Sequence, residues 1–143
     1  MDKVFVDTNI ILDWLGKREP FYQYAKALFS LAEERKAEVL ISTMSFITTE
    51  YILRKQLGKE RAKRAIAGLR TFSSVCDCGS SEIDLSLVSE MDDFEDAFQY
   101  YIAINNGATV LITRNLKDFV QSRIPIMDPE AYIKNYGHEQ NVG

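Results

Sequence analysis

The stretch VFVDTNIILDWL, residues 4 to 15, decides the fold that we predict for this chain. Its β-branched start predicts a short buried strand, and the apolar residues from Ile10 onward predict a helix. Asp7 stands at the junction of the two and is followed by Thr8 and Asn9. An ionised Asp is rarely buried without a partner, so Asp7 either caps the helix or binds a cation. This stretch alone leaves both interpretations open.

The 143 residues have the composition of one globular domain, with 46% hydrophobic and 27% charged side chains. We assign residues 1–135 to this domain and expect residues 136–143, which include the only histidine, His138, to be a flexible tail. The sequence lacks a membrane-span-length apolar run and a signal sequence, which predicts a cytoplasmic protein with no membrane partner. Cys76 and Cys78 are expected to be reduced thiols, because a structural zinc site needs four ligands.

Short β-rich runs alternate with helical stretches along the whole chain. The predicted strands are residues 3–6, 38–42, 73–77, 108–113 and 124–128. Besides the helix that follows Asp7, the predicted helices are residues 22–37, 44–58, 59–72, 81–90 and 93–107. Each spacing allows a crossover helix between parallel strands. We therefore predict an α/β fold, with a central, mainly parallel sheet of four to five strands between two layers of helices.

Polar side chains gather at the edge of this sheet where ligands bind in open α/β folds, beyond the carboxyl ends of the strands. They are Asp7, Thr8 and Asn9 after the first strand, Asp93 and Asp96 at the start of the helix over 93–107, and Arg114, Asn115 and Asp118 after the strand over 108–113. Each also has an ordinary structural interpretation as a helix cap or turn residue. Together they indicate a cation site, because clustered carboxylates repel one another unless a cation such as Mg²⁺ or Mn²⁺ neutralises them.

The net charge of −4 conceals a basic stretch over residues 53–70, where seven cations accompany only Glu60. A solvated helix face is one explanation. A surface for phosphates or for an acidic partner is the other.

Three blocks of the chain together resemble a PIN domain, the nuclease fold of VapC-type toxins. They are VFVDTNIILDWL, DFEDAFQYYIA at 93–103 and ITRNLKDF at 112–119, and the resemblance extends from Val4 to about Tyr132. It implies an α/β/α sandwich that cleaves RNA with Mg²⁺ or Mn²⁺, forms a homodimer and is blocked by an antitoxin protein. By this resemblance Asp7 matches the family's first acid and Asp96 its third.

The other acids follow the family pattern less closely. Asp93 is an acidic neighbour typical of this branch of the family, and the fourth acid falls between Asn115 and Asp118. The second, usually Glu, aligns with Thr48, while the nearest carboxylate is Glu50. Two residues along a helix correspond to a rotation of about 200°. Glu50 is therefore the weakest of the metal-ligand candidates, and one metal ion with several waters is favoured over two.

The resulting hypothesis is a metal-dependent endoribonuclease, the toxin of a toxin–antitoxin pair. Its catalytic residues are Asp7, Asp96 and Asp118, and its metal ligands are Asp7, Asp93, Asp96, Asn115, Asp118 and Glu50. We expect Thr8, Asn9 and Arg114 to position the substrate.

Two alternatives stay open. One is a degenerate PIN domain that binds RNA or protein without cleavage. The other is a phosphotransfer domain, which the Asn at position 9 and the lack of a lysine after the last strand disfavour.

Overall fold

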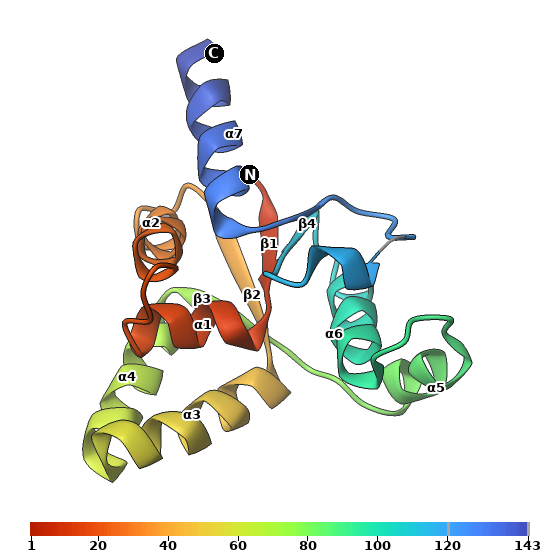
Figure 1. Cartoon of the computed structure of the whole chain (residues 1–143), viewed down its shortest axis with the longest axis horizontal. Coiled ribbons are helices and arrows are strands. Elements are labelled where there is room, and N and C mark those ends of the chain that lie inside the picture. The colour runs from red at the N-terminus through yellow and green to blue at the C-terminus, as the bar shows by residue number, and fades with distance from the viewer. Residues whose placement is uncertain (120, 143) are drawn as a thin grey trace.

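The computed structural model of this chain describes residues 1–119 and 121–142, and it describes the side chains of all of these except residues 137–142. Figure 1 shows a central sheet with helices on both sides, as the sequence predicts. The chain alternates between strand and helix from its first strand to its last, so each strand is separated from the next by at least one helical segment.

The sheet has five strands, all parallel, in the order β3-β2-β1-β4-β5. The strands are β1 (Lys3–Val6), β2 (Glu38–Ser42), β3 (Ser73–Cys76), β4 (Val110–Ile112) and β5 (Ile126–Met127). This confirms the predicted parallel sheet, with strands at each predicted place. Because β1 lies between β2 and β4, residue Asp7 directly after β1 is at the centre of the carboxyl edge.

Helical segments occupy every connection. They are α1 (Thr8–Leu15), α2 (Tyr22–Glu33), α3 (Thr43–Leu57), α4 (Lys59–Thr71), α5 (Ser80–Val88), α6 (Phe94–Asn105), the 3₁₀ turn η1 (Leu116–Phe119) and α7 (Pro129–Val142). Helix α2 ends four residues earlier than predicted. Arg35 has a φ of 58°, which is incompatible with a continuing right-handed helix.

The two faces of the sheet have separate cores. Val4 and Val6 of β1 pack with residues of α1, α2 and α7, including Phe29 and Tyr132. Phe5 points to the opposite face, where it packs with residues of α6, because successive side chains of a strand alternate. Helix α5 lies on α6 (Figure 1). The first residues of α1 and α6 therefore reach the same sheet edge from opposite faces.

Helices α3 and α4 follow one another and pack together as a helical hairpin (Figure 1). Gly58 joins them with a φ of 85°, a left-handed conformation that glycine adopts without steric cost, and its N–H donates to the carbonyl of Arg54. Leu53 and Ala62 attach the hairpin to Leu12 of α1 in a small apolar cluster.

Helix α7 extends into residues that the sequence analysis assigns to a flexible tail, residues 136–143. Asp128 caps this helix by accepting a hydrogen bond from the Ala131 N–H at 2.8 Å, and Pro129 occupies its first position. The helix continues to Val142, and residue 143 lies outside the described residues. The flexibility of this segment stays a prediction, and the side chain of His138 is not among those described.

Both cysteines are free thiols. Burial is the main cause that raises the pKa of the Cys76 thiol to about 11, so it stays protonated at neutral pH. Among the described residues, no helix combines the length and the apolar character that crossing a membrane requires.

Candidate active site

Asp7 is the most constrained carboxylate at the sheet edge. One oxygen, Oδ1, accepts a hydrogen bond from the Thr8 N–H at 2.7 Å, and the other, Oδ2, accepts one from the Thr113 hydroxyl at 2.9 Å. Its side chain is 6% exposed, and burial is the main cause that raises its pKa. Asp7 thus caps α1, as the structural interpretation predicts, and the cap holds its carboxylate at the edge.

Asp96 lies in the first turn of α6, where Asp93 caps the helix by accepting from the Asp96 N–H at 2.9 Å. Burial raises the pKa of Asp96 to about 7, and the neighbouring charges of Asp93, Asp7 and Asp118 add to the effect. Asp118 therefore lies close enough to Asp96 for its side chain to disfavour the ionised form of Asp96. We call Asp7, Asp93, Asp96 and Asp118 the acidic edge.

The loop after β4 is anchored to Asp7. The Thr113 hydroxyl that donates to Asp7 also accepts from the N–H of Asn115 at 3.1 Å, and the carbonyl of Asn115 accepts from the Asp118 N–H at 3.2 Å. A chain of three hydrogen bonds therefore connects the first acid to Asp118. The Asn115 side chain is exposed, and both of these bonds involve the main chain of this residue. Of the two candidates for the fourth acid, the structure brings Asp118 to the acidic edge through its side chain.

Glu50 is not brought to this edge. It forms a two-point ion pair with Arg54 one turn further along α3, which lowers the Glu50 pKa, and the other charge that acts on it is Lys59. Thr48, which occupies the family's second-acid position by alignment, is half-buried. The rotation argument from the sequence, that these two residues face different sides of α3, fits this placement.

Thr8 is buried rather than presented to a substrate. Its hydroxyl lies 2.6 Å from that of Ser45 in α3, and the amide nitrogen of Gln99 in α6 donates to both. The Ser42 hydroxyl also bonds to Ser45, at 3.1 Å. This buried network joins the first turns of α1 and α3 to α6, so Thr8 has a positioning role within the protein. Among the buried side-chain oxygens and nitrogens of the described residues, Thr49 Oγ1 and Gln99 Oε1 have no hydrogen-bond partner.

Arg114 is already engaged. Its guanidinium binds the fully buried carboxylate of Asp13 through two bonds of 2.8 and 3.2 Å and lies over the Phe21 ring at 4.0 Å. Its charge lowers the pKa of Asp7 and so favours the ionised form. Asn9 is half-buried, and its side chain makes no hydrogen bond with any other described residue. Of the three predicted substrate-positioning residues, Asn9 alone has a side chain that makes no hydrogen bond with another described residue.

The sequence analysis did not single out four residues that shape this edge. Thr113 and Gln99 hold Asp7 and Thr8, Asp13 holds Arg114, and Glu95 adds a further acid. Burial and the charges of Asp7 and Asp93 raise the Glu95 pKa. Two signals were visible: a lone Gln in the apolar run of α6 and a lone Asp in that of α1.

The donor set at the acidic edge is made of carboxylate oxygens, which suit a hard divalent cation. Among the side chains that the structure describes, residues 1–119 and 121–136, no three of Asp, Glu, Cys or His are close enough together to hold a metal ion. Mg²⁺ keeps several waters and is commonly bound through only one or two carboxylates. An ion bound through one or two carboxylates therefore fits the residues present. The raised pKa of Asp96 reflects burial together with neighbouring negative charge, and a cation would neutralise that charge.

Comparison with known proteins places this architecture in a family. The sequence profile of the PIN domain matches residues 3–117, and the chain belongs to the PIN domain family, as the sequence blocks predict. It is 26% identical over 140 residues to Ribonuclease VapC1 of Aquifex aeolicus, a match that covers 94% of this chain and 96% of the relative.

Two solved structures share the fold at low sequence identity. One is a toxin-antitoxin complex from Klebsiella pneumoniae, with a TM-score of 0.67, 22% identity, and coverage of 88% of this chain and 97% of the other. The second is VapBC2 from Rickettsia felis bound to a DNA fragment from its promoter, with a TM-score of 0.66, 20% identity and the same coverage.

Proposed function

We propose that this protein is a metal-dependent endoribonuclease that hydrolyses RNA phosphodiester bonds, and that it is the toxin of a toxin–antitoxin pair. The observation that carries the proposal is the convergence of Asp7, Asp96 and Asp118, three acids from distant parts of the chain, on one sheet edge. Its resemblance in sequence to a relative named Ribonuclease VapC1 supports the reaction. Structural relatives described as toxin–antitoxin complexes support the partner.

In the mechanism that we propose, Asp7 and Asp96 would hold Mg²⁺ or Mn²⁺, with Asp93 and Asp118 beside them. When bound at such a site, the ion would supply a more acidic water and neutralise charge on the phosphate. Asp118 is placed beside Asp96 and would accept the proton that the attacking water releases. Thr113 and the Thr8 N–H keep the Asp7 carboxylate in a fixed orientation throughout. Asn9 is the side chain available to contact the phosphate.

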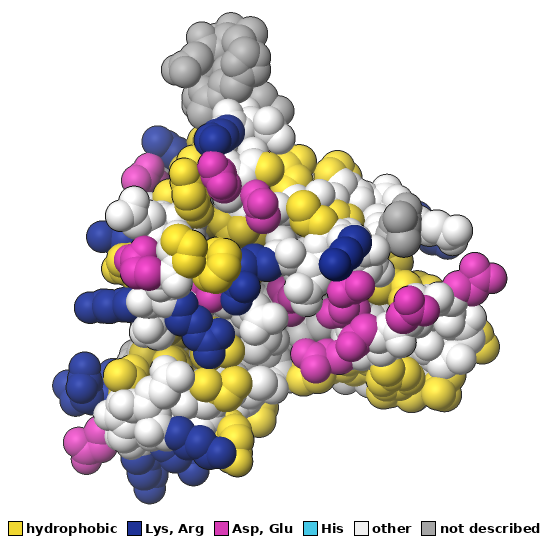
Figure 2. Space-filling model, viewed as in Figure 1, with side chains coloured by type: hydrophobic (Ala, Val, Ile, Leu, Met, Phe, Trp, Pro, Cys, Tyr) yellow, Lys and Arg dark blue, Asp and Glu magenta, His cyan; other side chains and the backbone are white. Residues whose placement is uncertain are grey.

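RNA binding is assigned to the cations of the α3–α4 hairpin rather than to Arg114, whose guanidinium is engaged by Asp13. We call Lys55, Lys59, Arg61, Lys63 and Arg64 the basic hairpin; all five are exposed. Figure 2 shows Lys and Arg side chains over α3 and α4, and Asp and Glu side chains gathered where α6 and η1 meet. Phosphates of RNA are attracted to the first surface and repelled by the second unless a cation is bound there.

The alternative, an RNA-binding or protein-binding PIN domain without activity, is favoured by one observation. The second-acid position is Thr48, and the nearby Glu50 is paired with Arg54. The experiment that separates the two is Mn²⁺-dependent cleavage of single-stranded and structured RNA. It compares the wild-type protein with Asp96→Asn. Glu50→Gln is the control, because it also removes one carboxylate.

We expect Asp96→Asn to lower the cleavage rate by about 10²-fold or more, the usual effect of removing an acid–base group. Glu50→Gln keeps the wild-type rate, because Glu50 lies outside the acidic edge. If folded wild-type protein cleaves nothing with either ion and still binds RNA or a protein, the inactive binding domain is the better account. If Asp96→Asn cleaves as well as wild type, a contaminating nuclease is responsible and the proposal fails.

A further inference from the structure

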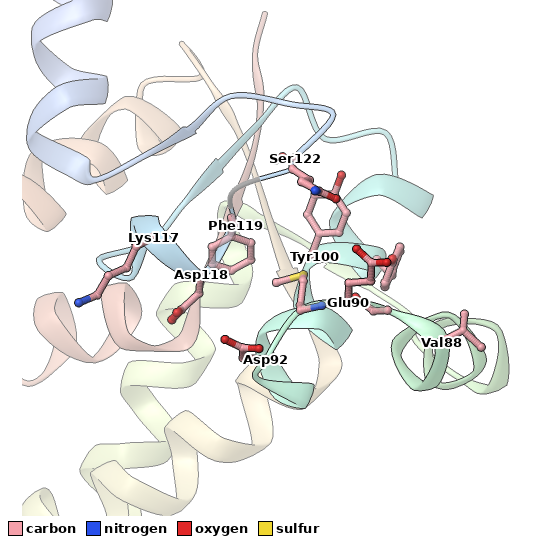
Figure 3. A pocket seen from close by; sticks show the side chains of 12 residues that line it. Val88, Glu90, Asp92, Tyr100, Lys117, Asp118, Phe119 and Ser122 are labelled. Atoms are coloured by element: carbon pink, nitrogen blue, oxygen red, sulfur yellow. Dashed lines mark hydrogen bonds between the residues drawn. The ribbon is translucent and has the colours of Figure 1, made fainter.

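A cavity of about 490 Å³ adjoins the acidic edge (Figure 3). Its walls are the end of α5 and the loop after it (residues 88–92), one side of α6, the η1 turn, and residues 121 and 122. The volume is within the range of roughly 300 to 1,000 Å³ that small-molecule sites occupy. No step of the proposed hydrolysis uses this cavity.

The cavity and the acidic edge share a residue. Asp118 belongs to the edge because its side chain acts on Asp96, and it also lines the cavity, while Asp92 on the other wall directly precedes Asp93. In the view of Figure 3 the carboxylates of Asp118 and Asp92 lie near one another. A phosphate bound at the edge therefore places an attached nucleotide within reach of the cavity.

One wall of the cavity is aromatic. The Tyr100 ring packs against Tyr101 with centroids 5.2 Å apart and against Phe119 at 6.4 Å. Tyr100 and Phe119 are 7% and 6% exposed, and the Tyr100 hydroxyl accepts from the Arg123 N–H at 2.8 Å, so this wall is fixed in place. Tyr101 is only half-buried. Fixed aromatic rings are the surfaces on which proteins stack unpaired nucleobases.

The polar side chains of the cavity exclude anions. Three carboxylates line it, Glu90, Asp92 and Asp118, against the single cation Lys117, whose amine points away from the aromatic rings in Figure 3. Phosphate groups are repelled by this excess of negative charge. A neutral planar ring with N–H groups is favoured instead, because carboxylates accept hydrogen bonds from such groups, as Asp and Glu do from the amino group of cytosine.

We propose that this cavity binds the nucleobase next to the scissile phosphate and prefers bases with an exocyclic amino group over uracil. The inference rests on the proposed nuclease function and adds a substrate preference to it. The base stacks on the aromatic wall, and its amino group donates to a carboxylate at the rim. The cavity thus selects which phosphodiester is presented to the acidic edge.

The test uses a short RNA that the protein cleaves at one position, in which each flanking nucleotide is replaced in turn by an abasic residue or by uridine. At one of the two positions we expect the abasic RNA to lower kcat/KM about tenfold or more, the usual effect of removing one stacked base. Uridine lowers it by less, because it keeps the stacking and lacks the amino group. Unchanged kcat/KM for the abasic RNAs would overturn the proposal while leaving the nuclease function intact.

A cavity-filling variant locates the effect. Val88 lies at the rim and is 79% exposed, so Val88→Trp narrows the cavity without disturbing the core, and Leu87→Trp, 68% exposed and outside the cavity, is its control. Val88→Trp should lower kcat/KM for the normal RNA to that of the abasic RNA and leave the abasic RNA unaffected. Equal effects on both RNAs, or the same effect from Leu87→Trp, contradict the proposal.

If the wild-type protein cleaves no RNA, the proposed nuclease function fails, and the cavity is then tested by equilibrium binding of a short single-stranded RNA with and without one abasic residue. If the wild-type protein binds the abasic RNA more weakly than the normal RNA, and Val88→Trp binds both equally, the base site is supported. Equal affinities mean that the cavity does not serve RNA, and a segment of a protein partner becomes its better occupant.

Discussion

The acidic edge and the basic hairpin carry opposite charges, and the protein holds these charges in different ways. The acids are fixed: both oxygens of Asp7 accept hydrogen bonds, and Asp93 accepts one from the Asp96 N–H. Lys59, Arg61, Lys63 and Arg64 are exposed and form no ion pair with any other described residue. Fixed groups suit chemistry at one atom, whereas mobile cations suit attraction of a long, variable anion.

The distance between the acidic edge and the basic hairpin determines which part of an RNA substrate each region contacts. Helix α3 begins beside the acidic edge, where Ser45 contacts Thr8 and Gln99, and it has 15 residues. At 1.5 Å per residue, the end of α3 that carries Lys55 and leads to Lys59 is roughly 20 Å from the edge. Cations at that distance bind phosphates several nucleotides from the scissile bond, so they contribute to affinity and not to the chemical step.

The largest expected effect concerns the fourth acid. Asp118→Asn should lower kcat/KM by about 10²-fold, because the Asp118 carboxylate lies beside Asp96 at the acidic edge. Asn115→Ala is the matched control and should change kcat/KM only a few-fold, since the main chain of Asn115 makes its hydrogen bonds. Steady-state cleavage with Mn²⁺ measures both variants. The opposite ranking would assign the fourth position to Asn115.

We expect substitutions in the basic hairpin to weaken RNA binding and to leave the rate of the chemical step unchanged. Lys63→Glu combined with Arg64→Glu weakens RNA binding and reduces the slope of log K against log salt by about 0.7 for each phosphate that the variant no longer neutralises. Its control is Lys26→Glu with Lys36→Glu, the same charge change at exposed positions in α2 and just after it. Fluorescence anisotropy over a salt series gives the slopes. A fall in kcat at saturating RNA would contradict the division between the two regions.

The acidic edge should destabilise the metal-free protein as the pH rises. Asp96 holds its proton to about pH 7 in the folded state, while its ordinary pKa is 3.8. Between these values the unfolded chain has released a proton that the folded protein keeps, so stability falls with increasing pH. We expect a contribution of about 1–2 kcal/mol, reduced from the full shift because the edge is open to solvent.

Thermal unfolding at pH 5 and pH 8 with a chelator measures this contribution. Asp96→Asn should make the melting temperature less dependent on pH, and Mn²⁺ should raise the wild-type melting temperature more at pH 8 than at pH 5. Identical pH dependence in the wild-type protein and Asp96→Asn would show that Asp96 does not carry the shifted proton.

The smallest effect is expected at Glu50, which is part of neither the acidic edge nor the basic hairpin. Glu50→Gln removes an exposed ion pair with Arg54 and should leave RNA cleavage, RNA affinity and the melting temperature unchanged within error. The three measurements above are repeated on this variant. A loss of Mn²⁺-dependent cleavage would bring Glu50 back as a metal ligand.

Most of the fold was predictable because the pattern of the sequence is local. The apolar runs that become β1 and β2 and the periodic stretches of α2 and α6 indicate their own structure. Helix α7 was also indicated by Asp128-Pro129, a capping residue followed by proline, and the sequence analysis did not use that signal. The end of α2 depends on the positive φ of Arg35, which no pattern of apolar residues indicates.

The site was predictable in part, since parallel strands bring the residues that follow them to one edge. This rule identified Asp7, Asp96 and Asp118 without knowledge of any contact between them. It could not identify Thr113 and Gln99, whose roles depend on contacts with residues 106 and 91 positions away. Arg114 was assigned to the substrate because its buried partner, Asp13, is recognisable only once α1 is packed against the loop after β4.

The hydrogen bond from Thr113 to Asp7 also bears on the synthesis of the protein. The ribosome makes Asp7 before Thr113, the residue that positions it, which follows 106 residues later at roughly 5–20 residues per second. A translation product that stops before η1 lacks Asp118 as well. Under the proposed activity, a chain whose synthesis stops between Asp7 and η1 therefore contains the first acid but does not cleave RNA.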